Sequence, residues 1–564
     1  MKTNWSFIIL LALLVNCKNI EKADFVVVNA RIYTADSTKM NATAMAIKGN
    51  RFLAVGNEEE IKIFIGSNTQ KINLNGAFVM PGIIEGHGHF LGLGSSLKNL
   101  NLLQTKYWQE IVDSVAQHVG RTAKGVWIEG RGWHQDKWKD KFLNTYNAYP
   151  YHDALSKISP DNPVVLYHAS GHALIANAKA MEIAGITSET QSPAGGRIVK
   201  DKDKKLTGVF EENAMDLINL PYEAYVKSLN PNERLEKLKL EARLASEKAL
   251  EYGITSFQDA GSSLVDMDLL YSLCMDKTIH QRMYVMLYEP IDSMIIKMQQ
   301  LPFKTSDANR FKSVAVKTYM DGALGSYGAW LMEDYADNPG SRGQNIIDPS
   351  KIKEMAQSAV RQNLQLCVHA IGDRANKEVL DICEEIAQND KQFSSRRWRI
   401  EHAQHLRRED LNRFYALGVI ASMQAIHCTS DAPFVAKRLG EERAKSSSYV
   451  WRSLLDAHVH LANGTDTPVE NVNPFECMYA ALTRKRLDNG FCFHPEECMT
   501  RDEMLKSYTI WNAYASKDET QKGSISPGKL ADFIVVDRDL FHCPEIEIAS
   551  AKVLEVYMDG KKLR

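Results

Sequence analysis

The chain has 564 residues, of which 44% are hydrophobic and 24% are charged. These proportions are typical of a folded globular protein, and they exclude extensive disorder and low-complexity structure. The 68 Lys and Arg residues nearly balance the 70 Asp and Glu residues, so the formal charge of −2 carries no electrostatic signature of nucleic-acid binding. The length favours more than one structural unit, although one α/β barrel can itself exceed about 250 residues.

The N-terminus is predicted to be a cleaved signal that ends at a lipid attachment site. Lys2 supplies a positive charge, and the apolar run 7–15 is too short to span a bilayer. The run ends in Leu14-Val15-Asn16-Cys17, which resembles a bacterial lipobox, although Asn16 departs from the small residue usual before the cysteine. We therefore expect a signal peptide over 1–16, lipidation of Cys17 and a location in the bacterial cell envelope, periplasmic or outer membrane. An ordinary cleaved signal is the alternative.

Both ends of the remaining chain are rich in short β-type runs. The runs 24–34 and 44–56 near the start, and 532–537 and 553–560 near the end, are broken by Gly, Asn and Asp, as in small antiparallel sheets. Two β-rich ends around one long middle predict a single composite β-sandwich domain built from 23–79 and 520–564.

The middle of the chain alternates between short apolar strands and longer amphipathic stretches. Strand-like runs include 314–317, 366–369 and 419–423, while 232–252 has helical spacing and stops at Gly253 before another strand-like run. This alternation predicts an α/β fold, a (β/α)8 TIM-like barrel over 80–519. The segment of about 107–216, rich in Trp, Gly and Pro, interrupts the pattern and is predicted to be an inserted subdomain near the barrel mouth.

The other eight cysteines form no C-x-x-C pair, and we expect most of them to be buried thiols. Cys477, Cys492 and Cys498 lie close enough in sequence to leave a disulfide open.

The sharpest local motif is His87-Gly88-His89, which follows Met80-Pro-Gly-Ile-Ile-Glu-Gly. Residues two apart in a strand point to the same side, so the two imidazoles can share one face, which suits a divalent metal. The flanking glycines leave room for close approach of the backbone. An isolated H-x-H pair is weak evidence, and its weight depends on the rest of the chain.

Further side chains able to bind a metal stand at the ends of other short apolar strands. They are Lys317, His369, His402 and Asp466. Barrel enzymes place their chemistry at the C-terminal ends of the strands. A Lys or Asp buried there without a partner would be costly, so this combination points to a metal site rather than to packing.

The order H-x-H, Lys, His, His, Asp resembles the amidohydrolase superfamily. The flanking motifs resemble its YtcJ-like, amidohydrolase-3 branch, which includes N-substituted formamide deformylases, and the resemblance covers essentially residues 23–560. The matching motifs are WIEGRGW (127–133), VKTYMDGALGS (316–326), VHAIGDRAN (368–376), SMQAIH (422–427) and GSISPGKLAD (523–532). They are specific for the branch but give almost no information about the substrate.

The resemblance implies a role for each residue. His87, His89 and Asp466 would bind the more buried metal, while His369 and His402 would bind a second. A carboxylated Lys317 would bridge the two, because a lysine in a metal-rich, partly desolvated site has a lowered pKa and a free amine. An uncarboxylated lysine beside a single metal is the alternative. Zinc is the expected metal, with iron and manganese left open.

The expected reaction is metal-assisted hydrolysis of a non-peptide C–N bond, such as an N-acyl, formamide or cyclic amide bond. A metal-activated hydroxide would attack the substrate, with Asp466 as general base and then general acid. We expect His172 and His427 to be catalytic, and Asp321, Trp133 and Gln424 to contact substrate.

Two local departures from the superfamily stand out. Glu85 occupies a position that is usually Asp, which we interpret as a change behind the ligands. His458 and His460 form a second H-x-H pair, which we interpret as a decoy near a strand.

Two other functions remain as alternatives: a deaminase of the same superfamily, and a lipid-anchored binding protein without catalysis. The expected partner is a small-molecule substrate, with no nucleic acid and with membrane contact only through the lipid anchor. The sequence leaves a homodimer open.

Overall fold

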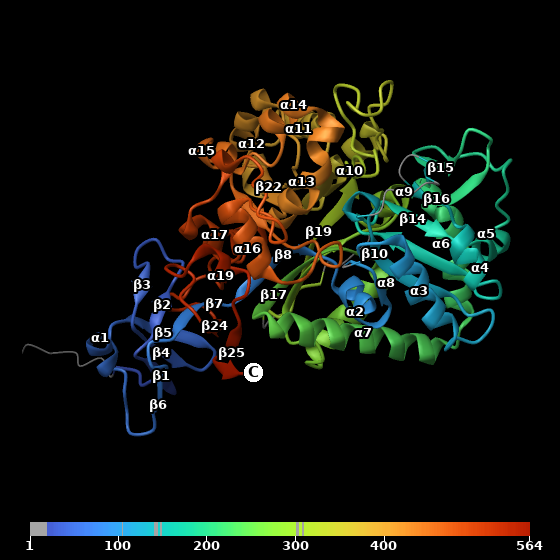
Figure 1. Ribbon diagram of the computed structural model, residues 1–564. Coiled ribbons are helices and arrows are strands. Elements are labelled where there is room, and N and C mark those ends of the chain that lie inside the picture. Colours follow the sequence, from blue (N-terminus) through green and yellow to red (C-terminus); the bar gives the residue numbers. More distant parts are fainter. Residues whose placement is uncertain (1–19, 104, 140–144, 147–148, 300–303, 307–308) are drawn as a thin grey trace, which may run out of the picture.

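The structure is a computed structural model that describes residues 20–103, 105–139, 145–146, 149–299, 304–306 and 309–564 (Figure 1). The predicted signal over 1–16 and the predicted lipid site at Cys17 lie outside these residues. Within them, no helix combines the length and hydrophobicity needed to cross a membrane. The eight cysteines within this part are free thiols, five of them buried, so no disulfide joins Cys477, Cys492 and Cys498.

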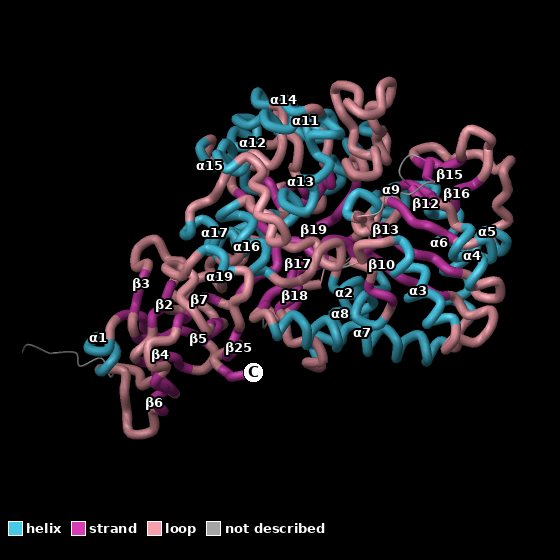
Figure 2. Tube along the Cα trace, in the orientation of Figure 1, coloured by secondary structure: helices cyan, strands magenta, loops and turns pink. Residues whose placement is uncertain are grey.

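Eight parallel strands form a nearly closed barrel at the centre of the molecule (Figure 2). In sheet order they are β23 (Leu461–Asn463), β22 (Ile420–Met423), β21 (Arg399–His402), β20 (Gln365–Ala370), β19 (Phe311–Tyr319), β18 (Arg282–Leu287), β17 (Ile254–Ser262) and β8 (Ile83–Gly88). The sheet order follows the chain order in one direction, with helical segments between most strands, as the alternating sequence pattern predicts. The predicted TIM-like barrel is confirmed.

The first and last barrel strands are joined by a side chain as well as by backbone. The Asn512 amide donates to the carbonyl oxygens of Ile84 on β8 and Asn463 on β23, at 2.6 and 2.7 Å. Just beyond the strand ends, Asp466 N donates to His87 O at 2.7 Å. These bonds hold the H-x-H motif and the Asp466 loop against each other, which brings together two segments almost 380 residues apart.

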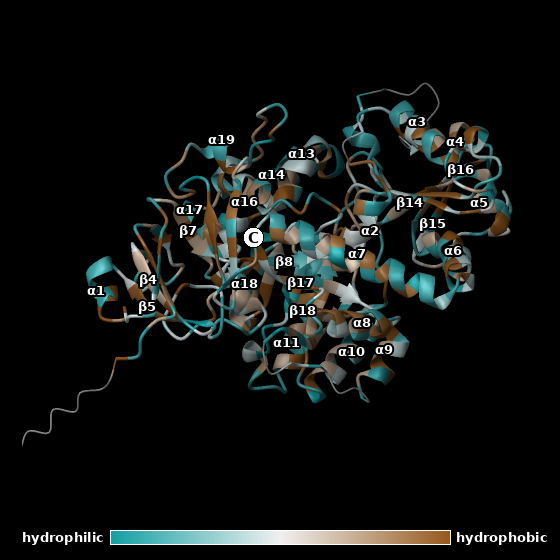
Figure 3. Cartoon of the chain, turned by 90° about the horizontal axis from the view of Figure 1, so that it is seen from below, coloured by the Kyte–Doolittle hydropathy of each residue, from teal (hydrophilic) through white to brown (hydrophobic). Residues whose placement is uncertain are grey.

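Helix α7 (Pro231–Glu251) confirms the helix predicted over 232–252. The Asn230 side chain accepts the backbone N–H of Asn232 and Pro231 occupies the first turn, which is favourable N-terminal chemistry. The helix ends before Gly253, whose φ of +72° lies in the left-handed region that glycine adopts at low cost. Figure 3 shows hydrophilic and hydrophobic positions alternating along α7, as expected for a helix on the barrel surface.

Strands from both chain ends form a two-layered β-sandwich beside the barrel (Figure 1). One sheet has the order β5 (Arg51–Gly56), β4 (Ala44–Lys48), β1 (Phe25–Val28), β6 (Gln70–Asn73). The other has the order β26 (Lys561–Lys562), β25 (Val553–Met558), β24 (Phe533–Val536), β7 (Phe78–Pro81), β2 (Arg31–Tyr33), β3 (Asn41–Ala42). Val27 and Ile47 of the first sheet pack with Val79 and Phe533 of the second in one apolar core. The predicted composite sheet domain is confirmed as part of the fold.

A third unit is inserted between β8 and β17 and lies on the opposite side of the barrel from the sandwich (Figure 1). Its six-stranded sheet has the order β15 (Gly196–Lys200), β16 (Leu206–Glu212), β14 (Ala173–Ala176), β13 (Val164–His168), β10 (Ile128–Trp133), β9 (Leu100–Asn101). Helices α3 (Trp108–Val119), α4 (Asp153–Ile158), α5 (Ala178–Ile183) and α6 (Asp216–Ser228) accompany it. This unit forms one wall of the cavity described below.

Gly94 is the point of closest approach between α2 (Phe90–Lys98) and α7. A methyl group on Gly94 would lie 2.0 Å from Glu241 O, so Gly94→Ala must push the two helices apart. Overpacking of this kind typically costs about 1–3 kcal/mol, which exceeds the gain of up to about 1 kcal/mol from replacing a helical glycine. We expect a lower free energy of unfolding in urea. Gly120→Ala is the control, because its nearest neighbour would be 3.6 Å away; equal stability of both variants would contradict the packing.

Candidate metal centre

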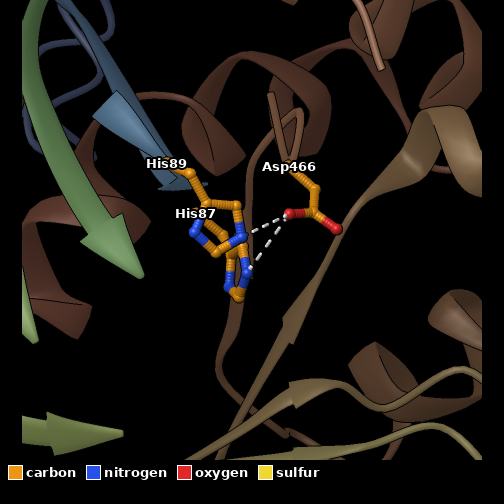
Figure 4. A group of neighbouring side chains, drawn as sticks. All are labelled: His87, His89 and Asp466. Atoms are coloured by element: carbon orange, nitrogen blue, oxygen red, sulfur yellow. Dashed lines mark ion pairs between the residues drawn. The ribbon is translucent and has the colours of Figure 1, made fainter. Parts of the chain in front are cut away.

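His87, His89 and Asp466 converge at the C-terminal end of the barrel (Figure 4). His87 lies in β8 and His89 is the N-cap of α2, while Asp466 lies in the loop after β23. The Nε2 atoms of His89 and His87 are 3.2 and 3.6 Å from Asp466 Oδ1. Asp466 has φ +57°, a left-handed conformation that Asp tolerates better than most residues.

Glu85 braces the two loops that carry these residues. Its buried carboxylate accepts the backbone N–H groups of Thr465 at 2.7 Å and His87 at 3.2 Å. A side chain at Gly464 would collide with Glu85 Oε1, so the close approach requires glycine. Burial raises the pKa of Glu85 to about 8. The residue therefore stands behind the ligands, as its interpretation from sequence proposes.

His87 is oriented by a buried chain of charges that sequence analysis missed. Its Nδ1 is 2.5 Å from Glu401 Oε2, and Glu401 Oε1 is 2.7 Å from Arg399 Nε. The Glu401 carboxylate accepts the proton on Nδ1, which leaves the Nε2 lone pair free to bind a metal. Burial lowers the pKa of His87 to about 4, so the ring is neutral at pH 7. The one signal in the sequence is the position of Glu401, immediately before His402.

His402 is oriented in the same way. Its Nδ1 is 2.7 Å from Gln424 Oε1, which again leaves Nε2 free. Gln424 is only 2% exposed, and its amide nitrogen donates to Ser422 O. The expectation that Gln424 contacts substrate stays a prediction; in the structure both ends of its amide are engaged inside the barrel, where it positions a histidine.

His369 and Lys317 complete the predicted set. The rings of His369 and His402 are 4.4 Å apart, and burial holds the pKa of both well below the usual histidine range. Lys317 is 1% exposed on β19, and burial lowers its pKa. Lys317, His369, His402, Asp466 and His89 line one cavity. All six residues predicted to bind metal are therefore brought together, and their individual roles remain a prediction.

Two residues expected to contact substrate serve the framework instead. The Asp321 carboxylate is fully buried and accepts three backbone N–H groups, from Trp330, Ile371 and Gly372, which fixes the loop after His369. Trp133 is also fully buried, and its indole donates to Leu166 O within the core of the inserted sheet. Substrate contact by these two residues stays a prediction, and neither of them lines the two cavities at the cluster.

A local irregularity of β10 explains the burial of Trp133. Strand alternation would place Trp133 on the same face as Glu129 and Arg131, but β10 has a bulge between Arg131 and Trp133, with Gly132 at φ +115°. The extra residue turns Trp133 to the opposite face.

The two predicted catalytic histidines flank the six residues. His172 Nδ1 is 2.8 Å from Glu212 Oε2, and the His172 and His369 rings are 5.0 Å apart. His427 Nε2 is 3.8 Å from Asp466 Oδ2, and the Gln404 amide donates to His427 Nδ1 at 3.0 Å. Because Nδ1 accepts, the proton of neutral His427 lies on Nε2, which favours a hydrogen-bond donor over a metal ligand. Sequence analysis missed Glu212 and Gln404, for which no motif gave a signal.

The second H-x-H pair lies elsewhere. His458 packs on Tyr415, and His460 stacks on Tyr514 with ring centroids 4.2 Å apart. Both precede β23, whereas Asp466 follows it, so they lie at the opposite end of that strand from the cluster.

The unpartnered atoms of the cluster fit a divalent cation. The buried Nε2 atoms of His87 and His369 and Oδ1 of Asp466 have no hydrogen-bond partner among the described residues. Leaving such atoms unpaired is costly, and neutral imidazoles with a carboxylate are a ligand set for zinc and similar metals. A cavity of about 470 Å³ opens on one side of the cluster and a smaller one of about 50 Å³ on the other.

The amidohydrolase family model matches residues 70–563 of the chain. The chain belongs to the amidohydrolase family. This amidohydrolase is 35% identical to Protein LONG AFTER FAR-RED 3 of Arabidopsis thaliana, over 96% of this chain and 91% of that protein. It is 28% identical to the putative amidohydrolase YtcJ of Bacillus subtilis (strain 168), over 94% and 97%. It is 26% identical to the N-substituted formamide deformylase of Arthrobacter pascens, over 95% and 97%. The predicted branch is confirmed.

Solved structures agree with this assignment. An uncharacterized metal-dependent hydrolase from Pyrococcus horikoshii superposes with a TM-score of 0.72 at 25% identity, covering 92% of this amidohydrolase and 99% of that chain. Another from Pyrococcus furiosus gives a TM-score of 0.69 at 27% identity, covering 92% and 100%. Family and neighbours support a metal-dependent hydrolase.

Proposed function

We propose that this amidohydrolase hydrolyses a non-peptide C–N bond of the N-acyl, formamide or cyclic amide type. The observation that carries the proposal is the convergence of histidines on Asp466 at the mouth of the barrel, with the rings of His87 and His402 held in place by Glu401 and Gln424. The N-substituted formamide deformylase, similar over 95% of this chain, supports a C–N bond as the target.

One or two divalent cations would be held by His87, His89, His369, His402, Asp466 and Lys317, and zinc is the expected metal. Such a cation supplies Lewis acidity and lowers the pKa of water to about 7. Lys317 is the proposed bridging ligand in carboxylated form, and its burial supports the free amine that carboxylation requires.

The protein's own groups would move the protons. Asp466 Oδ2 would take a proton from the attacking water and return it to the leaving amine. His427, with its proton on Nε2 and 3.8 Å from Asp466, would donate a hydrogen bond to the oxygen on which charge develops. His172, held by Glu212 at the cavity edge, would contact the substrate from the opposite wall.

The test is a screen of formamides, N-acyl amines and cyclic amides with the metal-loaded protein, followed by product analysis. We expect an amine and a carboxylic acid, with loss of turnover after chelation and recovery on adding zinc. Release of ammonia would identify a deaminase instead. Absence of turnover across the screen, with metal bound, would favour a binding protein and contradict the proposal.

A further inference from the structure

The larger cavity lies between the barrel and the inserted subdomain. The barrel contributes His89 and Asp466 to its lining, and the inserted sheet contributes Arg131 from β10 and Tyr167 from β13. Arg131 and Tyr167 are directly paired across the two strands, so both side chains leave the sheet on the same face. A substrate bound at the metal cluster extends toward this wall.

Three of the acidic groups in the cavity wall have other partners. Glu129 accepts the Tyr222 hydroxyl at 2.7 Å, and Glu212 is engaged by His172 at 2.8 Å. Asp466 lies 3.2 Å from His89. Each of these carboxylates is thus committed to a tyrosine or histidine and not to the cavity's arginine.

Arg131 is a cation in the cavity wall that pairs with none of these three carboxylates. Its Nη2 donates one hydrogen bond, to Ala169 O at 3.1 Å, and its buried Nε has no partner within the described part of the chain. Arg131 is half-buried and forms no ion pair within the described part of the chain, although Asp466 and Glu129 lie near enough to offset part of the burial that lowers its pKa. A half-buried guanidinium that lines a cavity and has unpaired N–H groups can bind an anionic ligand there.

The backbone beside Arg131 makes room for its guanidinium. A Cβ on Gly171 would lie 3.1 Å from Arg131 Nη2, and Gly171 has φ +78°. The aromatic side chains of Tyr167, Tyr288 and Tyr319 line the same cavity and offer an apolar surface next to the cation.

We propose that Arg131 binds a carboxylate on the substrate, so that this enzyme acts on amides whose amine portion carries an anionic group beside an apolar one. The guanidinium fork matches a carboxylate, and a charged hydrogen bond from this wall of the cavity would orient the scissile bond toward Asp466. The inference rests on the proposed function, which it makes more specific.

The test compares two formamides with the same scissile bond. N-formylphenylalanine, as separate D and L forms, carries the carboxylate, and N-formylphenethylamine lacks it. Binding to the metal-free protein is measured by calorimetry, and kcat/KM is measured with the zinc-loaded protein. The variants are Arg131→Met, which keeps the length, and Arg131→Lys, which keeps the charge but loses the fork. Arg121→Met is the control, because it removes an exposed arginine of the same subdomain.

We expect one N-formylphenylalanine enantiomer to bind at least about 10-fold more tightly than the neutral analogue, and Arg131→Met to abolish that preference. In Arg131→Met, kcat/KM for the carboxylate substrate is expected to fall about 100-fold, mainly through KM, while that for the neutral analogue changes less than about threefold. Arg131→Lys should retain part of the preference, and Arg121→Met all of it.

Equal binding of both formamides by the unmodified protein, or a preference that survives in Arg131→Met, would overturn the inference. Cleavage of the neutral analogue in that case would leave the proposed function standing. The reverse result is also informative. If carboxylate binding depends on Arg131 but the zinc-loaded protein cleaves neither formamide, the role of Arg131 is supported and the proposed hydrolysis is contradicted.

Discussion

Asp466→Asn is expected to lower kcat by about 10³–10⁴-fold while the fold is retained, because an amide cannot accept and return a proton. Burial by itself would raise the pKa of Asp466, but its close contacts with the His89 and His87 rings outweigh burial and hold the pKa below the usual range. The carboxylate is therefore ionised at neutral pH and available as a base. Asn is the informative substitution, because it tolerates the left-handed backbone at φ +57° that Ala would strain.

Turnover of Asp466→Asn should be measured at saturating zinc, together with zinc content and thermal unfolding. This separates loss of the base from weaker metal binding, since Asp466 would also be a ligand. A variant that binds zinc, unfolds like the unmodified protein and keeps its turnover would refute the assigned role.

The second large effect is expected from Glu401→Ala. Glu401 is fully buried between Arg399, at 2.7 Å, and His87, at 2.5 Å. Removing it leaves the Arg399 guanidinium buried without its counter-ion, which typically costs about 3–5 kcal/mol. It also frees the His87 ring, and loss of such an orienting partner usually lowers metal affinity by about 10–100-fold.

Urea unfolding of the metal-free protein measures the first effect of Glu401→Ala, and a competitive zinc titration measures the second. Glu401→Gln keeps an acceptor for His87, so its metal affinity should lie closer to that of the unmodified protein. Glu409→Ala is the matched control, since it removes a glutamate whose side chain is 66% exposed and pairs with Arg407, a contact worth about 0–1 kcal/mol. A loss from Glu401→Ala no greater than that control would contradict the buried charge chain.

The barrel could be predicted from sequence because its signals are local. Apolar strands such as 366–369 and the helix over 232–252 follow from side-chain periodicity within one segment. The clustering of Lys317, His369, His402 and Asp466 also follows, because the C-terminal ends of parallel strands meet at one rim.

Side-chain partners could not be predicted where part of a residue's surroundings comes from a distant segment of the chain. Trp133 was assigned to the cavity from its aromatic character, but a bulge at Gly132 reverses its face. Asp321 and Gln424 stand in the expected loops, yet backbone amides and His402 occupy their polar atoms. A sequence pattern shows that a polar group is near a site but not which partner it has.

The amino-acid sequence alone determined the order of barrel elements, the six candidate ligands and the family, since all of these depend on residue type and spacing. Tertiary structure alone decided which nitrogen of His87 and His402 is free, that Glu212 holds His172, and that Arg131 lines the cavity with its Nε unpartnered among the described residues. These are properties of pairs of groups, and hydrogen bonds and Coulomb interactions depend on separations in space that residues hundreds of positions apart acquire only when the chain folds.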